Sequence, residues 1–316
     1  MVSLSLESVK PLKISFSKNK NKHLKAAAEQ SFKDNATITK ISPHLESVKA
    51  QYGISSVKKI AFTGISTKSY PLPVSSTEIR NLLDKLVKSE KIKQSDFDKI
   101  INGESEVSYL LADKTNGEFS ANFKNHLNRL SYRPILTTLE GDGFIYHYAQ
   151  KGYRQLNSAL KKGGALNDDL NTVKIGLARA LDKLPNYTGT AYRGLKNFDE
   201  AKYLKAGGLY NPKEFISASD DITVSSQFGT KYKLVIKSKG GKFINDLSNG
   251  EDEGEVLFKS DSKFKVLSIG NTNADDLSEK QKSWVEEARK KVKDYITTSI
   301  FSDDMDSEKT YYLEEI

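Results

Sequence analysis

The sequence predicts an α+β protein in which helices come first and strands follow. Apolar residues recur at helical spacing in several segments before Pro185, and short β-branched and aromatic runs follow one another from Tyr187 onward. Helices followed by consecutive strands are typical of α+β folds, whereas a parallel sheet would require the two to alternate. The chain has 316 residues, which is more than one typical domain, so we expect two domains.

The N-terminal part is predicted to be a small α-rich domain over residues 21–135, preceded by a flexible N-terminus over residues 1–20. The first twenty residues are rich in Ser, Lys and Asn and show no clear period. Two later segments each present one apolar face at helical spacing. Their apolar positions are Ile79, Leu82, Leu83, Leu86 and Val87 in the first, and Phe97, Ile100 and Ile101 in the second. These patterns leave the role of the domain open.

The positive charge of the chain is concentrated in this N-terminal part. Residues 1–135 hold 22 Lys and Arg against 13 Asp and Glu, whereas the rest of the chain holds 27 against 28. A basic domain could bind an acidic partner, nucleic acid or a membrane surface, or could simply be a well-solvated surface. The lysines are not interleaved with aromatic residues, which weakens the case for nucleic acid.

The composition excludes several kinds of chemistry. The absence of cysteine excludes disulfides, a thiol nucleophile and a cysteine-ligated metal, and the four histidines show no ligand spacing, so we expect no metal. No transmembrane segment is expected, because no stretch approaches the roughly 20 apolar residues that a membrane-spanning helix requires. The N-terminus lacks the apolar core of a cleavable secretory signal. Delivery by an injection machine would leave no such mark.

The C-terminal part, residues 140–316, is predicted to begin with two helices, of which the second runs from Asn167 to Pro185. The first helix carries Ile145, Tyr148, Gly152, Leu156 and Ala159. Strands are expected over residues 188–194, 214–219, 231–238, 255–258, 264–270 and 310–316. A further helix from about Ser278 to Ile296 interrupts the strands, and we interpret it as an insertion.

Glu253 and Glu255 flank Gly254 directly before an apolar run, 256–258. Alternate residues of a strand point to the same face, so we expect both carboxylates to face the same way. Two like charges on one face disfavour each other unless a cation or a reaction requires them there. On its own the pair could equally be an acidic turn exposed to solvent.

Three further motifs carry polar or aromatic groups that a ligand could use. Arg193 ends a predicted strand and is followed by Gly194, so a guanidinium suited to phosphate oxygens stands beside a residue that permits close approach. Ser217 lies in the strand 214–219 without a histidine partner, so it is a poor nucleophile but could orient a carboxylate. Phe228 precedes a glycine, and by default it would be a core residue. Each motif alone is also compatible with a purely structural role.

The order of these motifs resembles the arginine-specific mono-ADP-ribosyltransferases. The segments 152–160 (GYRQLNSAL), 192–195 (YRGL), 215–219 (FISAS), 227–229 (QFG) and 254–258 (GEVLF) follow one another as in that family, which includes bacterial toxins, injected effectors and phage enzymes. The resemblance covers roughly residues 140–270 and the terminal strand. It implies an ADP-ribosyltransferase fold of two packed, mainly antiparallel sheets with flanking helices, and NAD as a substrate.

The resemblance also implies a role for each residue. Glu255 matches the catalytic glutamate, Glu253 the residue that confers arginine specificity, and Ser217 the serine that positions the catalytic glutamate. Arg193, with Gly194, matches the arginine motif that binds NAD, and Phe228 the aromatic that packs on nicotinamide. Ala218 departs from the family's Ser-Thr-Ser pattern, and the segment 246–252, which includes Glu251, matches the target-recognising loop.

The expected function is therefore transfer of ADP-ribose from NAD to an arginine of a target protein, with release of nicotinamide. The alternatives are a non-arginine target, mainly NAD hydrolysis, an inactive member that only binds, or a chain whose main function lies in its basic N-terminal domain. The resemblance implies a secreted or injected protein acting in the cytoplasm of a host cell, either a virulence effector or a phage enzyme. The target protein is not predicted.

Overall fold

The chain divides into two parts, Met1–Lys68 and Ser69–Ile316. The computed structural model describes residues 70–72, 76–112, 117–248, 253–298 and 309–316, all in the second part. The predicted flexible N-terminus and residues 21–69 of the predicted basic domain therefore lie outside the described residues. Among the described helices, none is both long and apolar enough to cross a membrane.

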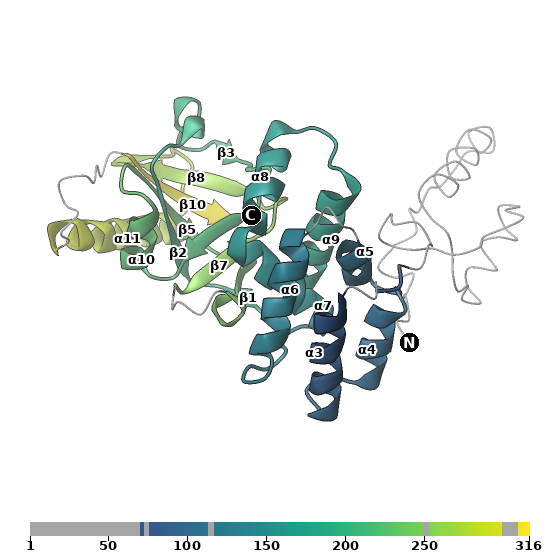
Figure 1. Ribbon diagram of the computed structural model, residues 1–316. Coiled ribbons are helices and arrows are strands. Elements are labelled where there is room, and N and C mark those ends of the chain that lie inside the picture. The colour runs from purple at the N-terminus through teal and green to yellow at the C-terminus, as the bar shows by residue number, and fades with distance from the viewer. Residues whose placement is uncertain (1–69, 73–75, 113–116, 249–252, 299–308) are drawn as a thin grey trace, which may run out of the picture. The chain divides into compact units, whose positions relative to one another are not determined.

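The first half of the described chain is helical, as the apolar spacing predicts (Figure 1). In the helix near residue 80, Ile79, Leu83 and Leu86 are buried, and Leu82 and Val87 pack against them. The helices are α3 (Thr77–Lys88), α4 (Gln94–Ile101), α5 (Glu106–Ala112), α6 (Gly117–Arg129), α7 (Leu139–His147), α8 (Tyr153–Lys162) and α9 (Asp168–Asp182).

The predicted domain boundary near residues 135–140 is wrong for the described residues. Leu83 and Phe123 of the upstream helices belong to the same apolar core as Phe144 and Leu177 downstream, and Leu257 of a later strand also joins this core. Helices α3–α6 therefore form part of the same compact unit as the rest of Ser69–Ile316. The helical periodicity identified the elements but could not show which core they share.

Helices α7 and α8 are joined by a π-helical turn, η2 (Tyr148–Gly152), so the single helix predicted here is continuous but locally widened. The imidazole of His147 explains the glycine in this turn. A Cβ atom at Gly152 would lie 2.3 Å from the His147 Nε2 atom. Turns of this kind are frequent at functional sites, and Tyr148 at its start reaches the site described below.

The strands form one hydrogen-bonded path in the order β1-β6-β7-β4-β2-β5-β10-β8-β3, with β9 beside β8. Only the β5–β10 pairing is parallel among them. The strands are β1 (Asn186–Tyr187), β2 (Thr190–Leu195), β3 (Leu209–Tyr210), β4 (Ile216–Ser219), β5 (Tyr232–Lys237), β6 (Gly241–Phe243), β7 (Glu255–Phe258), β8 (Phe264–Ile269), β9 (Thr272–Asn273) and β10 (Thr310–Glu315).

The path consists of two halves that meet at one residue pair, Tyr192 of β2 with Ser219 of β4. Side chains of both halves form one apolar cluster, in which Ile216 and Val256 from β4 and β7 join Leu234 and Leu313 from β5 and β10. The two packed sheets implied by the resemblance are thus two halves of a mainly antiparallel path. The α+β fold class is confirmed.

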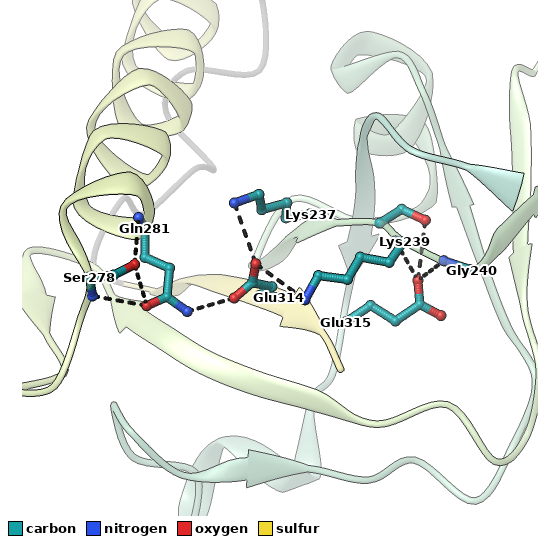
Figure 2. A network of polar contacts seen from close by, with 8 residues as sticks. Lys237, Lys239, Gly240, Ser278, Gln281, Glu314 and Glu315 are labelled. Atoms are coloured by element: carbon teal, nitrogen blue, oxygen red, sulfur yellow. Dashed lines mark hydrogen bonds and ion pairs between the residues drawn. The ribbon is translucent and has the colours of Figure 1, made fainter.

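The predicted insertion is helix α11 (Glu279–Thr298), which buries Val285, Ala288 and Val292 against the strands. Figure 1 shows it on the side of the strands away from α3–α9. Figure 2 shows how its start is tied to the last strand, because Gln281 donates to the carboxylate of Glu314 at 2.6 Å. The neighbouring Glu315 accepts the backbone N–H groups that follow β5, among them that of Gly240 at 2.6 Å.

Candidate active site

Three adjacent strands bring the predicted polar residues together. Strand β4 pairs antiparallel with β7 so that Ser219 lies opposite Glu255, and on its other side Ser219 pairs with Tyr192 of β2. Arg193 follows Tyr192 directly. Residues from β2, β4 and β7 that are far apart in the sequence therefore converge where the two halves of the path meet.

Hydrogen bonds join Arg193, Ser217 and Glu255 into one cluster. The Arg193 guanidinium donates from Nη1 to the Ser217 carbonyl oxygen at 2.5 Å. The Ser217 hydroxyl forms a hydrogen bond with the Glu255 carboxyl group. Arg193 and Ser217 are half-buried, whereas Glu255 is 8% exposed. The predicted association of these three residues is thus seen in the structure.

Burial dominates the electrostatics of Glu255. The pKa of the carboxyl is raised from 4.5 to about 7, mainly by burial and also by the nearby Glu253, although the Ser217 hydrogen bond and the Arg193 charge lower it. A buried carboxylate with this pKa is poorly stabilised when ionised. A cationic group that enters the site would therefore interact with it strongly.

Strand alternation does not explain why Glu253 lies near Glu255. Strand β7 begins at Glu255, and Gly254 before it adopts a left-handed backbone conformation, with φ of +56°. Glu253 is therefore outside the strand, although its charge still acts on Glu255. A Cβ atom at Gly254 would lie 1.8 Å from an Asp220 carboxylate oxygen, so both space and conformation require glycine here.

The backbone around Glu253 is fixed by strand β4 and the residues that follow it. Ser219 donates from its hydroxyl to the Glu253 carbonyl oxygen at 2.6 Å, and the Asp220 amide donates to the Gly254 carbonyl oxygen at 2.9 Å. The Gly254 amide in turn donates to the Asn245 side-chain oxygen at 3.0 Å. Ser219 lies in the predicted strand 214–219 with Ser217, but no role was predicted for it.

The family model described as NAD:arginine ADP-ribosyltransferase matches residues 113–283, more than half of the chain. The chain belongs to this family. The family match includes every predicted site residue and begins within the helical half. The predicted family membership is confirmed.

Individual relatives match over a shorter stretch. The Mav protein of Mycobacterium avium, provisionally assigned as an NAD(+)--arginine ADP-ribosyltransferase, is 37% identical over 127 residues, which are 39% of this chain and 15% of that protein. The NAD(+)--protein-arginine ADP-ribosyltransferase Tre1 of Serratia proteamaculans is 31% identical over 137 residues, 42% of this chain and 30% of Tre1. The alignments thus span less than a third of either relative.

Among solved structures, exoenzyme S of Pseudomonas aeruginosa, bound to human 14-3-3 protein beta and carba-NAD, superimposes with a TM-score of 0.48. The sequence identity is 16%, and the superposition covers 67% of this chain and 88% of that one.

Two further residues, Tyr148 and Asn157, form hydrogen bonds to the strand that carries Ser217 or to Phe215 just before it. Neither was predicted as a site residue. Tyr148 is fully buried and forms hydrogen bonds with Ser217 and with the Phe215 carbonyl oxygen, the latter at 3.2 Å. Asn157 donates to the same carbonyl at 3.0 Å and accepts from the Phe215 amide at 3.2 Å. Burial raises the pKa of Tyr148, which keeps its hydroxyl protonated. Asn157 lies in the helical motif that carried the resemblance, and this was the available signal.

The remaining predicted residues are placed differently from the cluster. At Gly194 a Cβ atom would lie 2.1 Å from the Gly229 carbonyl oxygen, so packing alone explains this glycine. Phe228 ends helix α10 (Ile222–Phe228) and is 56% exposed, which contradicts a core role. The hydrogen bonds that join the cluster do not include it. Ala218 is buried in the apolar cluster between the two halves, so its side chain faces away from Ser217.

The predicted target-recognising loop, 246–252, is described only in part. Asp246 lies in the short helix η4 (Asn245–Leu247), and Ser248 follows it. Residues 249–252, including Glu251, lie outside the described residues. The assignment of Glu251 to the target-recognising loop, and of Glu253 and Glu255 to the site, therefore stays a prediction for Glu251.

Proposed function

We propose that this chain is an NAD(+)--protein-arginine ADP-ribosyltransferase that uses Arg193, Ser217, Glu253 and Glu255. It would transfer ADP-ribose from NAD to an arginine of a target protein and release nicotinamide. The observation that carries the proposal is the buried Glu255 carboxyl, held by Ser217 and flanked by the Arg193 guanidinium and the Glu253 charge. Family membership supports the reaction class.

Glu255 would stabilise the charge that develops when the nicotinamide–ribose bond breaks. That cleavage gives the sugar oxocarbenium character, as in glycoside hydrolysis. A fixed carboxylate in a poorly hydrated site stabilises this positive charge far more than it would in water. The hydrogen bonds between Tyr148 and Ser217 and between Ser217 and Glu255 keep the carboxylate in place.

Arg193 would hold the phosphates of NAD, with Phe228 against the nicotinamide ring. A guanidinium has five N–H donors, so the bond to Ser217 leaves further donors for phosphate oxygens. Rigid anchoring of the diphosphate keeps the reacting carbon near Glu255. The large exposed fraction of Phe228 is compatible with a ring that a bound ligand would cover.

Glu253 would bind the incoming arginine of the target. A carboxylate pairs with a guanidinium through two parallel hydrogen bonds, and it can also assist removal of the proton. The substrate itself would then neutralise the like charges of Glu253 and Glu255.

The test compares two reactions of the same protein preparations. In Glu255→Gln, nicotinamide release and ADP-ribosylation of agmatine should fall together by about 100-fold or more, because the chemical step loses its charge stabilisation. In Glu253→Gln, transfer to agmatine should collapse while slow hydrolysis of NAD by water persists, since water requires no guanidinium partner.

Glu106→Gln is the matched control. Its carboxyl is also partly buried with a raised pKa, but it pairs with Arg179 in the helical half, so both reactions should persist. Equal losses of both reactions in Glu253→Gln would remove the support for arginine as acceptor. It would favour the alternative, a non-arginine target or mainly NAD glycohydrolysis.

A separate proposal concerns the site of action. A further relative, 24% identical over 174 residues, is named secreted exoenzyme S of Pseudomonas aeruginosa. We infer that this chain also acts outside the cell that makes it, on a protein in the cytoplasm of a host cell. The basic N-terminal part would be free to bind an acidic partner, and salt-dependent binding of the full chain compared with Ser69–Ile316 would test this.

A further inference from the structure

Arg129, the last residue of helix α6, and Arg133, which follows the helix, bind the backbone of the segment that leads to the glutamates. Arg129 donates from Nη1 to the Ser248 carbonyl oxygen at 2.5 Å, and Arg133 donates from Nη1 to the Asp246 carbonyl oxygen at 2.5 Å. Arg129 and Ser248 are 119 positions apart in the sequence. A contact of this kind links the helical half directly to the neighbourhood of Glu253.

The first of these arginines is itself held in place. The Arg129 guanidinium lies over the ring of Tyr146, 5.0 Å from its centroid, and Tyr146 is buried on α7. His126 packs against the same ring, and burial together with the Arg129 charge lowers the pKa of this histidine to about 3. The imidazole is therefore neutral at physiological pH and does not repel the guanidinium.

Neither guanidinium is engaged by a carboxylate of the part of the chain that the structure describes. Their hydrogen bonds go to backbone carbonyls, so they restrain the course of the chain independently of the side chains in this segment. Hydrogen bonds from a charged donor are stronger than neutral ones. Two of them two residues apart, at Asp246 and Ser248, fix both the position and the direction of the backbone.

Hydrogen bonds attach the start of the segment bound by the arginines to the backbone around the glutamates. The Ile244 amide donates to the Glu255 carbonyl oxygen at 2.8 Å, and Asn245 accepts the Gly254 amide at 3.0 Å. The backbone that carries Asp246 and Ser248 is therefore attached to the backbone of Glu253–Glu255. A displacement of the former would be transmitted to Glu253, which lies outside strand β7.

We propose that Arg129 and Arg133 are positioning residues that set the placement of Glu253, and so the binding of the acceptor, from the helical half of the chain. The inference rests on the proposed function for the role of Glu253. It assigns to α6 a part in acceptor binding that the strands alone do not provide.

The double variant Arg129→Gln/Arg133→Gln tests this proposal. The KM for agmatine should rise by about tenfold or more, because both charged hydrogen bonds to the segment are lost and each is worth at least about a factor of ten. The kcat/KM for NAD hydrolysis should stay within about twofold, because Glu255 is held by β4 and Ser217 instead. A lysine at both positions retains a charged donor and should restore part of the agmatine affinity.

Lys124→Gln is the control on the same helix, because it removes a positive charge that pairs with the exposed Glu78 and contacts none of the loop. It should change neither reaction. Equal losses of transfer and hydrolysis in the double variant would indicate a general structural role and overturn the proposal.

Hydrogen exchange provides a readout that needs no acceptor. The amides of Leu247 and Ser248, bonded to the Ile244 carbonyl, and of Gly254 should exchange faster in the double variant than in the wild type or in Lys124→Gln. Unchanged exchange at all three amides would overturn the proposal even if agmatine is modified normally. If the wild type does not modify agmatine but the double variant still exchanges faster than the wild type, the positioning role of the two arginines is supported. Only the proposed acceptor is then contradicted.

Discussion

The raised pKa of Glu255 predicts a specific dependence of activity on pH. This pKa is raised from 4.5 to about 7, mainly by burial, and the ionised form is the one that would stabilise the oxocarbenium. At pH 6 only about one tenth of the free enzyme would carry the ionised carboxylate, and about nine tenths at pH 8. The kcat/KM for NAD hydrolysis should therefore rise about tenfold over this range, because this ratio reports ionisations of the free enzyme.

The neighbouring charge supplies an internal check on that assignment. Glu253 raises the pKa of Glu255, so Glu253→Gln should shift the acid limb of the profile to lower pH while hydrolysis remains measurable. Glu106→Gln should leave the limb unchanged, since Glu106 lies in the helical half. The measurement is nicotinamide release at subsaturating NAD between pH 5 and 9.

The same shift predicts a change in stability that does not depend on catalysis. The folded state retains a proton on Glu255 that the unfolded state releases, so the free energy of unfolding should fall as pH rises from 4.5 to about 7. The loss relative to Glu255→Gln should level off above pH 7 at about 3 kcal/mol, from a shift of about 2.5 pKa units at 1.36 kcal/mol each. Denaturant unfolding at pH 5 and pH 8 measures it. An acid limb below pH 5, together with equal pH dependence of wild type and Glu255→Gln, would refute the reasoning.

Three further outcomes are expected. Arg193→Lys should raise the KM for NAD by about 10- to 100-fold, because an ammonium cannot reproduce the planar fork that binds phosphate, and an unchanged KM would leave Arg193 with a structural role only. Gly254→Ala should destabilise the chain more than Gly163→Ala in thermal unfolding. Both glycines have positive φ, which costs about 1 kcal/mol for alanine, but only at Gly254 does a Cβ atom collide with a neighbour. The buried His126 and His147 have pKa values lowered to about 3 and 4, so they should reduce the free energy of unfolding as pH falls below 6.5. His147→Asn should lessen that loss in acid titrations followed by circular dichroism.

The positions of the candidate site residues were predictable because each stands at a fixed place relative to a strand. Arg193 near the end of β2, Ser217 in β4 and Glu255 at the start of β7 needed only the strand pattern and the family order of motifs. The strand register then brings them together without further information. Longer strands such as β5 and β8 were predictable for the same reason, whereas β1 and β3 have two residues each and carry no detectable alternation.

Other features depend on contacts that local patterns do not record. Strand alternation correctly predicted that Glu253 lies near Glu255, but the reason was wrong. Gly254 has a left-handed backbone conformation, so the strand begins only at Glu255 and does not include Glu253. The bonds of Arg129 to Ser248 and of Tyr148 to Phe215 cross long stretches of sequence. A single sequence identifies an arginine or a tyrosine on a helix but not the carbonyl oxygen that it will meet.

The shared core also decides how the chain can be divided. The boundary predicted near residue 140 would remove α3–α6, whose buried Leu83 and Phe123 pack in the same core as Phe144 and Leu177. Removal would expose these partners to water, and burying a side chain of this size contributes about 1.5–3 kcal/mol. Since a whole domain is stable by only about 5–15 kcal/mol, residues 140–316 alone should not fold.

A chain that begins at residue 69 should behave differently, because it retains every helix of this core. We expect Ser69–Ile316 to be soluble, to unfold cooperatively and to hydrolyse NAD at the rate of the full chain. The core reaches the site itself, since Leu257 of β7, two residues after Glu255, packs in it together with the upstream helices. Measuring solubility, thermal unfolding and nicotinamide release for the two truncated chains tests the division. An active and cooperatively folded 140–316 fragment would show that α3–α6 are dispensable for the catalytic strands, and that the boundary predicted from the sequence near residue 140 is functionally correct.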